Sequence, residues 1–127
     1  MKFTVVRESL LKPLQSVIGV VERRQTMPVL ANVLLSAQDG QLTITATDLE
    51  VELVAVKEID AIDIPGEITV PGRKLLDICR ALPEAAVVKG GLEGDRLVIK
   101  SGRSRFVLST LPSLEFPVIN DIEADYE

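Results

Sequence analysis

The sequence lacks histidine and tryptophan entirely, and it has a single cysteine among its 127 residues. Without histidine, the chain has no Ser-His or Cys-His nucleophile pair, and it lacks the most common general base and zinc ligand. The one cysteine, Cys79, lies among leucines and an isoleucine at 75–82, which predicts a small buried side chain in a reducing compartment. These absences exclude most hydrolase chemistry and disfavour a catalytic thiol.

Long apolar runs and aromatic side chains are also scarce. No apolar run approaches about eighteen residues, and no basic-then-apolar leader precedes Phe3, so we expect no membrane span and a cytoplasmic protein. The three phenylalanines and one tyrosine are too few for the stacking platform that single-strand binders use. No glycine-rich phosphate loop is present, and we expect no cofactor and no bound metal.

The net charge of -5 is distributed unevenly along the chain. Residues 68–105 hold eight basic and four acidic side chains, whereas residues 106–127 hold five acidic side chains and no basic one. Residues 48–67 are also acidic, with seven acids and one base. A net negative protein can therefore still carry a local positive surface.

The first part of the chain has the pattern of a strand, a helix and three strands. Phe3-Thr4-Val5 alternates as a strand does, and a helix starting near Ser9 or Leu10 explains the apolar spacing through Val21. Asp39-Gly40 is a typical hairpin turn between strands over 32–37 and 42–47. A third strand is predicted over 51–56.

The same order recurs in the second part. A strand over 68–70 and a helix over 73–82 precede three strands predicted near 86–91, 95–101 and 104–110. The repeats cover about 1–57 and 66–110, and the first has about ten extra residues in the loop 19–31, which is either a functional loop or a tolerated insertion. We therefore predict one α+β domain of two β-α-β-β-β units, with both helices on one side of the strands.

The exposed faces of the two predicted helices carry basic side chains. Lys12 lies on the first helix, and Arg73 and Arg80 lie on the second, while Arg24 lies in the long loop. If the helices lie side by side, these four cations form a positive strip suited to phosphate contact without base recognition. The alternative is that they are ordinary solvated side chains.

Two further constellations have alternative interpretations. Arg103 and Arg105 are predicted on one face of a strand, with Phe106 and Leu108 on the other, so an edge position would favour the addition of another subunit. A solvated strand with its own buried face is the alternative. Asp48, Glu50 and Glu52 are expected on one strand face and could hold a divalent ion, although a solvated acidic face is favoured.

Five ordered segments resemble those of the beta subunits of bacterial DNA polymerase III, the DNA sliding clamps. The first, over 26–35, is similar to the clamp segment T-L-P-I-L-x-N-L-L-L. The others follow at the family's spacing, over 47–50, 70–75, 78–83 and 101–112. Together they span the whole chain.

The resemblance implies the DNA clamp fold and a non-enzymatic function. In this family, three such domains form one chain, and two chains close head to tail into a ring around duplex DNA, with helices lining the hole. The implied DNA contacts are Lys12, Arg24, Arg73 and Arg80. The implied residues of the subunit interface are Lys74, Ile78, Leu82, Arg103, Arg105, Phe106 and Leu108.

The resemblance also sets expectations for the rest of the protein. Residues 1–120 are expected to form the first clamp domain, and residues 121–127 to begin a linker to a second domain. DNA polymerase and clamp loader are expected to bind later domains, which this chain lacks. We expect the net acidity to lie on the outer rim, with positive charge reserved for the hole.

Two functions from other classes compete with this interpretation. One is a small adaptor that binds proteins, or itself, along the edge from Arg103 to Leu108. The other is a metal-dependent hydrolase built on Asp48, Glu50 and Glu52.

Overall fold

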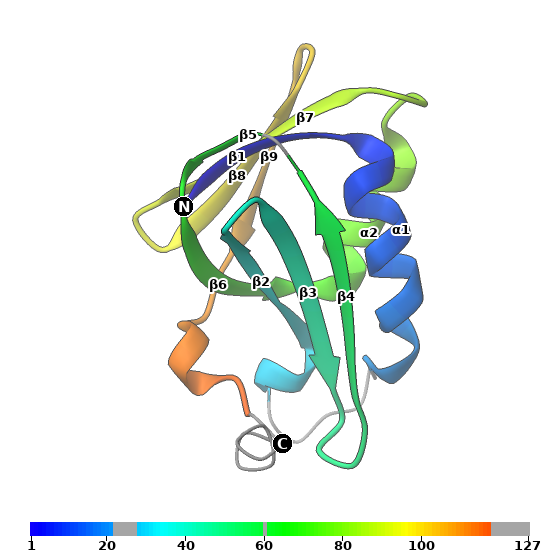
Figure 1. The fold of residues 1–127 in the computed structure, drawn as a ribbon, viewed down its shortest axis with the longest axis vertical. Coiled ribbons are helices and arrows are strands. Elements are labelled where there is room, and N and C mark those ends of the chain that lie inside the picture. The colour runs from blue at the N-terminus through cyan, green and yellow to red at the C-terminus, as the bar shows by residue number, and fades with distance from the viewer. Residues whose placement is uncertain (22–27, 60, 118–127) are drawn as a thin grey trace.

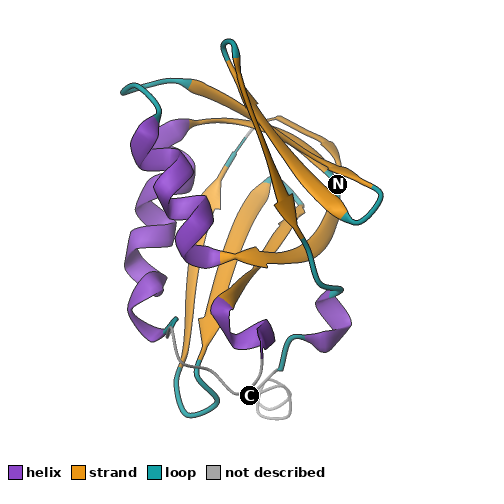
Figure 2. Cartoon of the chain, turned by 180° about the vertical axis from the view of Figure 1, so that it is seen from behind, coloured by secondary structure: helices purple, strands orange, loops and turns teal. Residues whose placement is uncertain are grey.

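The structure, a computed structural model, describes residues 1–21, 28–59 and 61–117. Within these residues, two antiparallel sheets pack against a pair of α-helices that lie next to each other on one side (Figures 1 and 2). This arrangement confirms the predicted α+β fold with two helices packed on antiparallel sheets. No helix in the described ranges has the length and apolar character needed to cross a membrane.

The elements follow one another in two similar series. The first series is β1 (Lys2–Val6), α1 (Arg7–Val17), the short 3-10 helices η1 (Ile18–Val20) and η2 (Pro28–Ala31), β2 (Asn32–Gln38), β3 (Gln41–Thr47) and β4 (Glu52–Glu58). The second is β5 (Ala61–Ile64), β6 (Gly66–Pro71), α2 (Gly72–Ala81), β7 (Val87–Glu93), β8 (Arg96–Ser101), β9 (Ser104–Ser109) and η3 (Ser113–Glu115).

Each half of the chain contributes the strand that precedes its helix to the sheet of the other half. The five-stranded sheet has the order β5-β1-β7-β8-β9, so β1 pairs with β7 of the second series. The four-stranded sheet has the order β4-β3-β2-β6, so β6 pairs with β2 of the first series. The two repeats are therefore interlocked and form one body.

The predicted boundaries hold for most elements, with three corrections. Helix α1 begins at Arg7, earlier than expected, so Pro13 lies inside it and cannot donate a backbone hydrogen bond. The helix ends at Val17, because a glycine and β-branched residues follow, and Val21 is extended. The short strand β5 has no counterpart in the prediction.

The hairpin between β2 and β3 matches its prediction. Asp39 and Gly40 both have positive φ, 54° and 72°, as a two-residue type I′ turn requires. This turn fixes the register in which Leu35 pairs with Ile44. Both side chains therefore point into the core.

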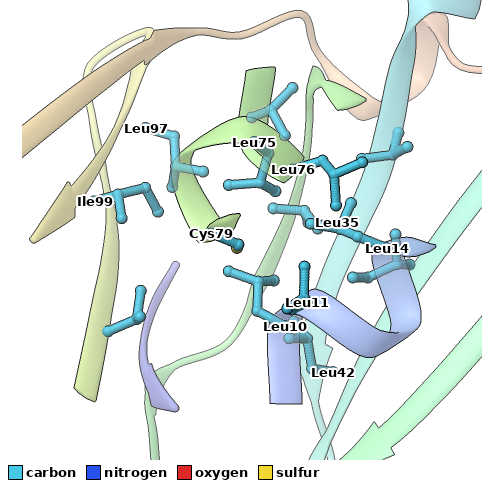
Figure 3. Close-up of a cluster of buried hydrophobic side chains, with 14 of the residues drawn as sticks. Leu10, Leu11, Leu14, Leu35, Leu42, Leu75, Leu76, Cys79, Leu97 and Ile99 are labelled. Carbon is cyan, nitrogen blue, oxygen red and sulfur yellow. The ribbon is translucent and has the colours of Figure 1, made fainter. Parts of the chain in front are cut away.

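The core lies between the helix pair and the inner faces of both sheets. Figure 3 shows leucines of α1 and α2 meeting leucines and an isoleucine of β2, β3 and β8 around Cys79. Leu10, Leu14 and Leu75 are fully buried, as is Cys79, which confirms the expected burial of the cysteine. One shared core thus supports both helices and both sheets.

The first turn of α1 is tied to the end of α2 by two charged side chains. The Arg7 Nε–H donates to the carbonyl oxygen of Cys79 at 2.7 Å, and the Arg7 guanidinium also pairs with Glu8 at 2.7 Å. The Glu8 carboxylate accepts the backbone N–H of Ala85 at 3.1 Å. The start of α1 therefore lies beside the end of α2, and the two helices run antiparallel.

A buried polar chain holds the segment after β9 against β6. The Asn32 side-chain amide donates to the Thr69 hydroxyl at 3.0 Å, and that hydroxyl donates to the Leu111 carbonyl at 2.9 Å. The backbones of Thr69 and Leu111 also exchange two hydrogen bonds of 3.1 Å. Phe116 then packs with Val29 and Leu30 on the outer side of this sheet.

We predict that Gly90→Ala destabilises the fold, whereas Gly91→Ala does not. A Cβ at Gly90 would lie 2.5 Å from Cζ of Phe3, a core ring in direct cross-strand register with Gly90. Overpacking of this kind costs about 1–3 kcal/mol. A Cβ at Gly91 meets only the Lys2 side chain, at 3.9 Å. Urea unfolding of both variants checks the difference, and equal midpoints would contradict it.

We predict that Glu8→Gln reduces the loss of stability in acid. The backbone N–H of Ala85 and the Arg7 guanidinium hold the pKa of Glu8 below 4.5, the ordinary glutamate value. A lowered folded-state pKa adds stability that is present above pH 4.5 and is lost as the pH falls through the folded-state pKa. The free energy of unfolding of the variant should vary less with pH below 4.5, as urea titrations at successive pH values would measure. Glu115→Gln serves as the control, and an equal change in both variants would contradict the assignment.

Candidate nucleic-acid interface

The solvent-exposed face of the helix pair carries two of the predicted DNA contacts. Lys12 on α1 and Arg80 on α2 are both exposed, and neither has an ion-pair partner within the described residues. Ser16 lies one turn after Lys12 and donates to the Lys12 carbonyl at 3.1 Å. Both cations are thus open to solvent on the antiparallel helix pair.

Backbone charge and neighbouring side chains shape the potential of this face. Arg80 lies in the last turn of α2, where a cation offsets the partial negative charge of the helix end. Asp77 lies one turn before Arg80 and is exposed as well. Asp77 therefore offsets only part of the positive charge of Lys12 and Arg80. The contact that these two cations could make with a phosphate backbone is weak and is screened by salt.

Arg73 has a different environment from Lys12 and Arg80. Its guanidinium Nη2 donates to the carbonyl oxygen of Val21 at 2.9 Å, and its Nε is buried with no hydrogen-bond partner among the described residues. Gly72 precedes it where the start of α2 packs closely, since a Cβ there would lie 2.9 Å from Val33. Arg73 is therefore an anchored, half-buried cation, and its DNA contact stays a prediction.

The two arginines at the helix starts have reciprocal roles. Arg7 of α1 donates to a carbonyl at the end of α2, and Arg73 of α2 donates to a carbonyl just after η1, which continues α1. Each end of the antiparallel pair is thus joined by one charge-assisted hydrogen bond. The fourth predicted contact, Arg24, lies outside the described residues.

The second predicted surface lies at the edge of the five-stranded sheet. Strand β9 pairs only with β8 among the described strands, so it lies at an edge of the five-stranded sheet, the position that would allow another subunit to add. Arg105 points away from the core and is exposed. Arg103 is also exposed, but it lies in the turn between β8 and β9 rather than on the strand, because Gly102 adopts the positive φ of that turn. The prediction that both arginines share a strand face was therefore wrong.

The apolar residues predicted for the subunit interface pack against the domain's own core. Leu82 and Leu108 are buried, whereas Ile78 and Phe106 are half-buried at the margin of the main cluster. Lys74 is exposed on α2. Only part of the apolar set is thus available to a partner, and its interface role stays a prediction.

The acidic residues at 48–52 do not share a strand face, because β4 begins only at Glu52. Asp48 forms a turn instead, in which its Oδ1 accepts the backbone N–H groups of Val51 at 2.8 Å and of Glu50 at 2.9 Å. These two bonds lower the pKa of Asp48. Within the described residues, no three acidic, histidine or cysteine side chains are grouped as a metal site requires.

Burial determines the chemistry of the single thiol. Desolvation raises the pKa of Cys79 to about 11, although the nearby Arg7 charge opposes the shift. The thiol therefore stays protonated at neutral pH, and a protonated buried thiol is a poor nucleophile.

Two residues that join the start of α1 to the end of α2 were not predicted from the sequence. Arg7 and Glu8 precede the expected helix start, and nothing in their local pattern points to the end of a helix more than seventy residues away. One signal was available. Val6, which precedes α1, has no side chain that could cap the helix, so the first turn of α1 has to be held by other contacts.

Comparison with known proteins identifies the family of this chain. The N-terminal domain of the DNA polymerase III beta subunit matches residues 1–120. The beta sliding clamp of Pseudomonas putida is 57% identical over 121 residues, which cover 95% of this chain and 33% of that protein. The beta sliding clamp of Escherichia coli strain K12 is 53% identical over 127 residues, or 100% of this chain and 35% of that protein. The chain thus spans about a third of the length of these relatives.

Solved structures agree with the sequence matches. The crystal structure of a sliding clamp, DNA polymerase III subunit beta, from Pseudomonas aeruginosa bound to griselimycin superposes with a TM-score of 0.92 at 56% identity. It covers 95% of this chain, which in turn covers 33% of that structure. A clamp from Caulobacter crescentus gives a TM-score of 0.91 at 48% identity, with coverages of 96% and 33%. The interlocked sheets, the antiparallel helix pair and these matches together show that the chain belongs to the family of DNA polymerase III beta subunits, as their N-terminal domain.

Proposed function

We propose that this chain is the first domain of a ring-shaped sliding clamp that encircles duplex DNA and confers processivity on the replicative DNA polymerase. Family membership and the clamp fold support this function. The observation that carries it is the antiparallel helix pair with Lys12 and Arg80 on its exposed face. The domain tethers and does not catalyse, in line with the names of its relatives.

A ring retains DNA through closure, so the domain needs no tight grip. Phosphate contacts from a few cations carry no sequence information and weaken as salt increases. Such contacts allow the ring to slide along the duplex while closure prevents escape. Lys12, Arg24, Arg73 and Arg80 are the side chains that we assign to them.

Two full-length subunits close head to tail, with the β9 edge and the exposed Lys74 facing the partner subunit. Polymerase and clamp loader bind domains that follow this one, and no cofactor takes part. Residues 1–120 form the domain, residues 121–127 lead toward the next one, and the protein acts in the bacterial cytoplasm.

We predict that replacing Lys12, Arg73 and Arg80 with Ala in the full-length clamp weakens its contact with DNA and reduces its salt dependence. Each lost phosphate contact lowers the slope of log K against log salt by about one. Fluorescence anisotropy with a labelled duplex, over a range of salt concentrations, measures the slope. Arg80→Ala alone tests the exposed cation without disturbing the Arg73 tie to Val21.

Arg96→Ala is the matched control for these variants. Arg96 is an exposed cation at the start of β8, and it pairs with Asp95 at 3.8 Å. The β7–β8 hairpin lies away from the helices in Figure 1. Its replacement should leave the slope unchanged. An unchanged slope in the triple variant would refute the DNA contacts assigned here.

We predict that Arg103→Glu combined with Arg105→Glu weakens the full-length dimer about tenfold. Both side chains are exposed near the β9 edge, so charge reversal alters the surface without removing core packing. Sedimentation velocity over a dilution series measures the dimer dissociation constant, with Arg96→Glu as the control. Equal constants in all three proteins would contradict the interface.

Self-association of the 127-residue chain discriminates the adaptor alternative. A clamp domain without its complementary partner face should remain monomeric at micromolar concentration. A dimer of this chain that the Arg105→Glu substitution disrupts would favour an adaptor that uses the same edge.

A further inference from the structure

The outward face of the five-stranded sheet carries a row of cations in direct register. Lys89 of β7 pairs with Lys100 of β8, and Lys100 pairs with Arg105 of β9. All three side chains are exposed and point away from the core, since Val88, Ile99 and the partly buried Phe106 point inward between them. We call Lys89, Lys100 and Arg105 the cation row.

Register makes this row costly for the fold. Directly opposed side chains in an antiparallel sheet have Cβ atoms about 5 Å apart, and like charges at that spacing destabilise the sheet. No ion pair or side-chain hydrogen bond within the described residues relieves any of the three. The expectation that positive charge is reserved for the helix-lined side of the domain therefore does not hold for this face.

A hollow of about 400 Å³ lies beside the row. Lys2, Lys89 and Lys100 contribute to its lining, and Gly91 and Val98 lie in register across its middle. Gly91 has no side chain to fill the space, and Val98 is only 4% exposed. The hollow is thus lined by three lysines and two acidic residues, with Gly91 and Val98 among its small or apolar residues.

We propose that this hollow and the cation row bind a short acidic segment of a partner protein. The row crosses three strands, or about 10 Å at the usual strand spacing, which suits one or two carboxylate side chains. Asp63 and Glu93 also line the hollow. These two carboxylates repel any bound anion, so the positive region is limited to the lysines and the cation row. A region of this size fits one or two carboxylates of a peptide better than the long run of phosphates in a nucleic acid.

The acidic segment would bind on the side opposite to the DNA contacts. The inward faces of β7, β8 and β9 pack toward the helices, so the cation row cannot reach DNA that lies against α1 and α2. The site is therefore distinct from the proposed DNA-contacting surface. It shares Arg105 with the proposed subunit interface, so Lys2, Lys89 and Lys100 are the cations that bind the segment when the ring is closed. DNA and the acidic segment could therefore be bound at the same time.

A labelled hexaglutamate peptide is a direct probe for this site. In fluorescence anisotropy at low salt, we expect binding to the 127-residue chain that weakens about tenfold in the variant Lys89→Ala/Lys100→Ala. The matched control is Lys12→Ala/Arg80→Ala, which removes two cations from the helix face and should leave peptide binding unchanged. A 12-base-pair duplex should compete poorly for the site.

Thermal stability provides an independent readout. Lys100→Glu places an acid between Lys89 and Arg105, so it should raise the melting midpoint by about 1–5 °C while abolishing peptide binding. A variant that is more stable but no longer binds the peptide would show that the cations serve binding at a cost in stability, which distinguishes a binding site from incidental surface charge. Equal peptide binding by the lysine double variant and the wild type would overturn the proposal, as would equally strong competition by the duplex.

Discussion

The exchange between the two halves of the strands that precede their helices is the constraint on which the rest of the structure depends. Strand β1 leads directly into α1, and β6 leads directly into α2, so each helix starts from a strand in the other half's sheet. The helices must then meet side by side and antiparallel. Arg7 and Arg73 complete the arrangement by joining each helix start to a carbonyl at the far end of its neighbour. The wall that faces DNA in our proposal is thus a product of topology more than of helix propensity.

Much of the fold follows from patterns that are local in the sequence. Alternating apolar residues located the strands, and Asp39-Gly40 identified a hairpin whose two positive φ angles the structure confirms. The internal repeat predicted two equivalent units, which the structure also has. Strand β5 was missed because Ala61–Ile64 is short and follows another strand closely, with no distinct turn signal between them.

The candidate sites were less predictable because they depend on register and on contacts between distant residues. Helical spacing correctly placed Lys12 and Arg80 on an exposed face, yet it did not show that Arg73 is anchored to Val21. Alternation alone put Asp48 on a strand, whereas its carboxylate closes a turn before that strand begins. The alignment of Lys89 with Lys100 appears only when the pairing of β7 with β8 is known.

The buried thiol has a practical consequence for work on this protein. Cys79 is the only cysteine in the chain, it is fully buried, and its pKa is raised to about 11. Maleimides and similar reagents require an accessible thiolate, so the folded domain offers them no background target. A cysteine introduced at an exposed position would then be the single modifiable group. Spectroscopic probes could be attached there one at a time, with the native thiol left in place to fill its part of the core.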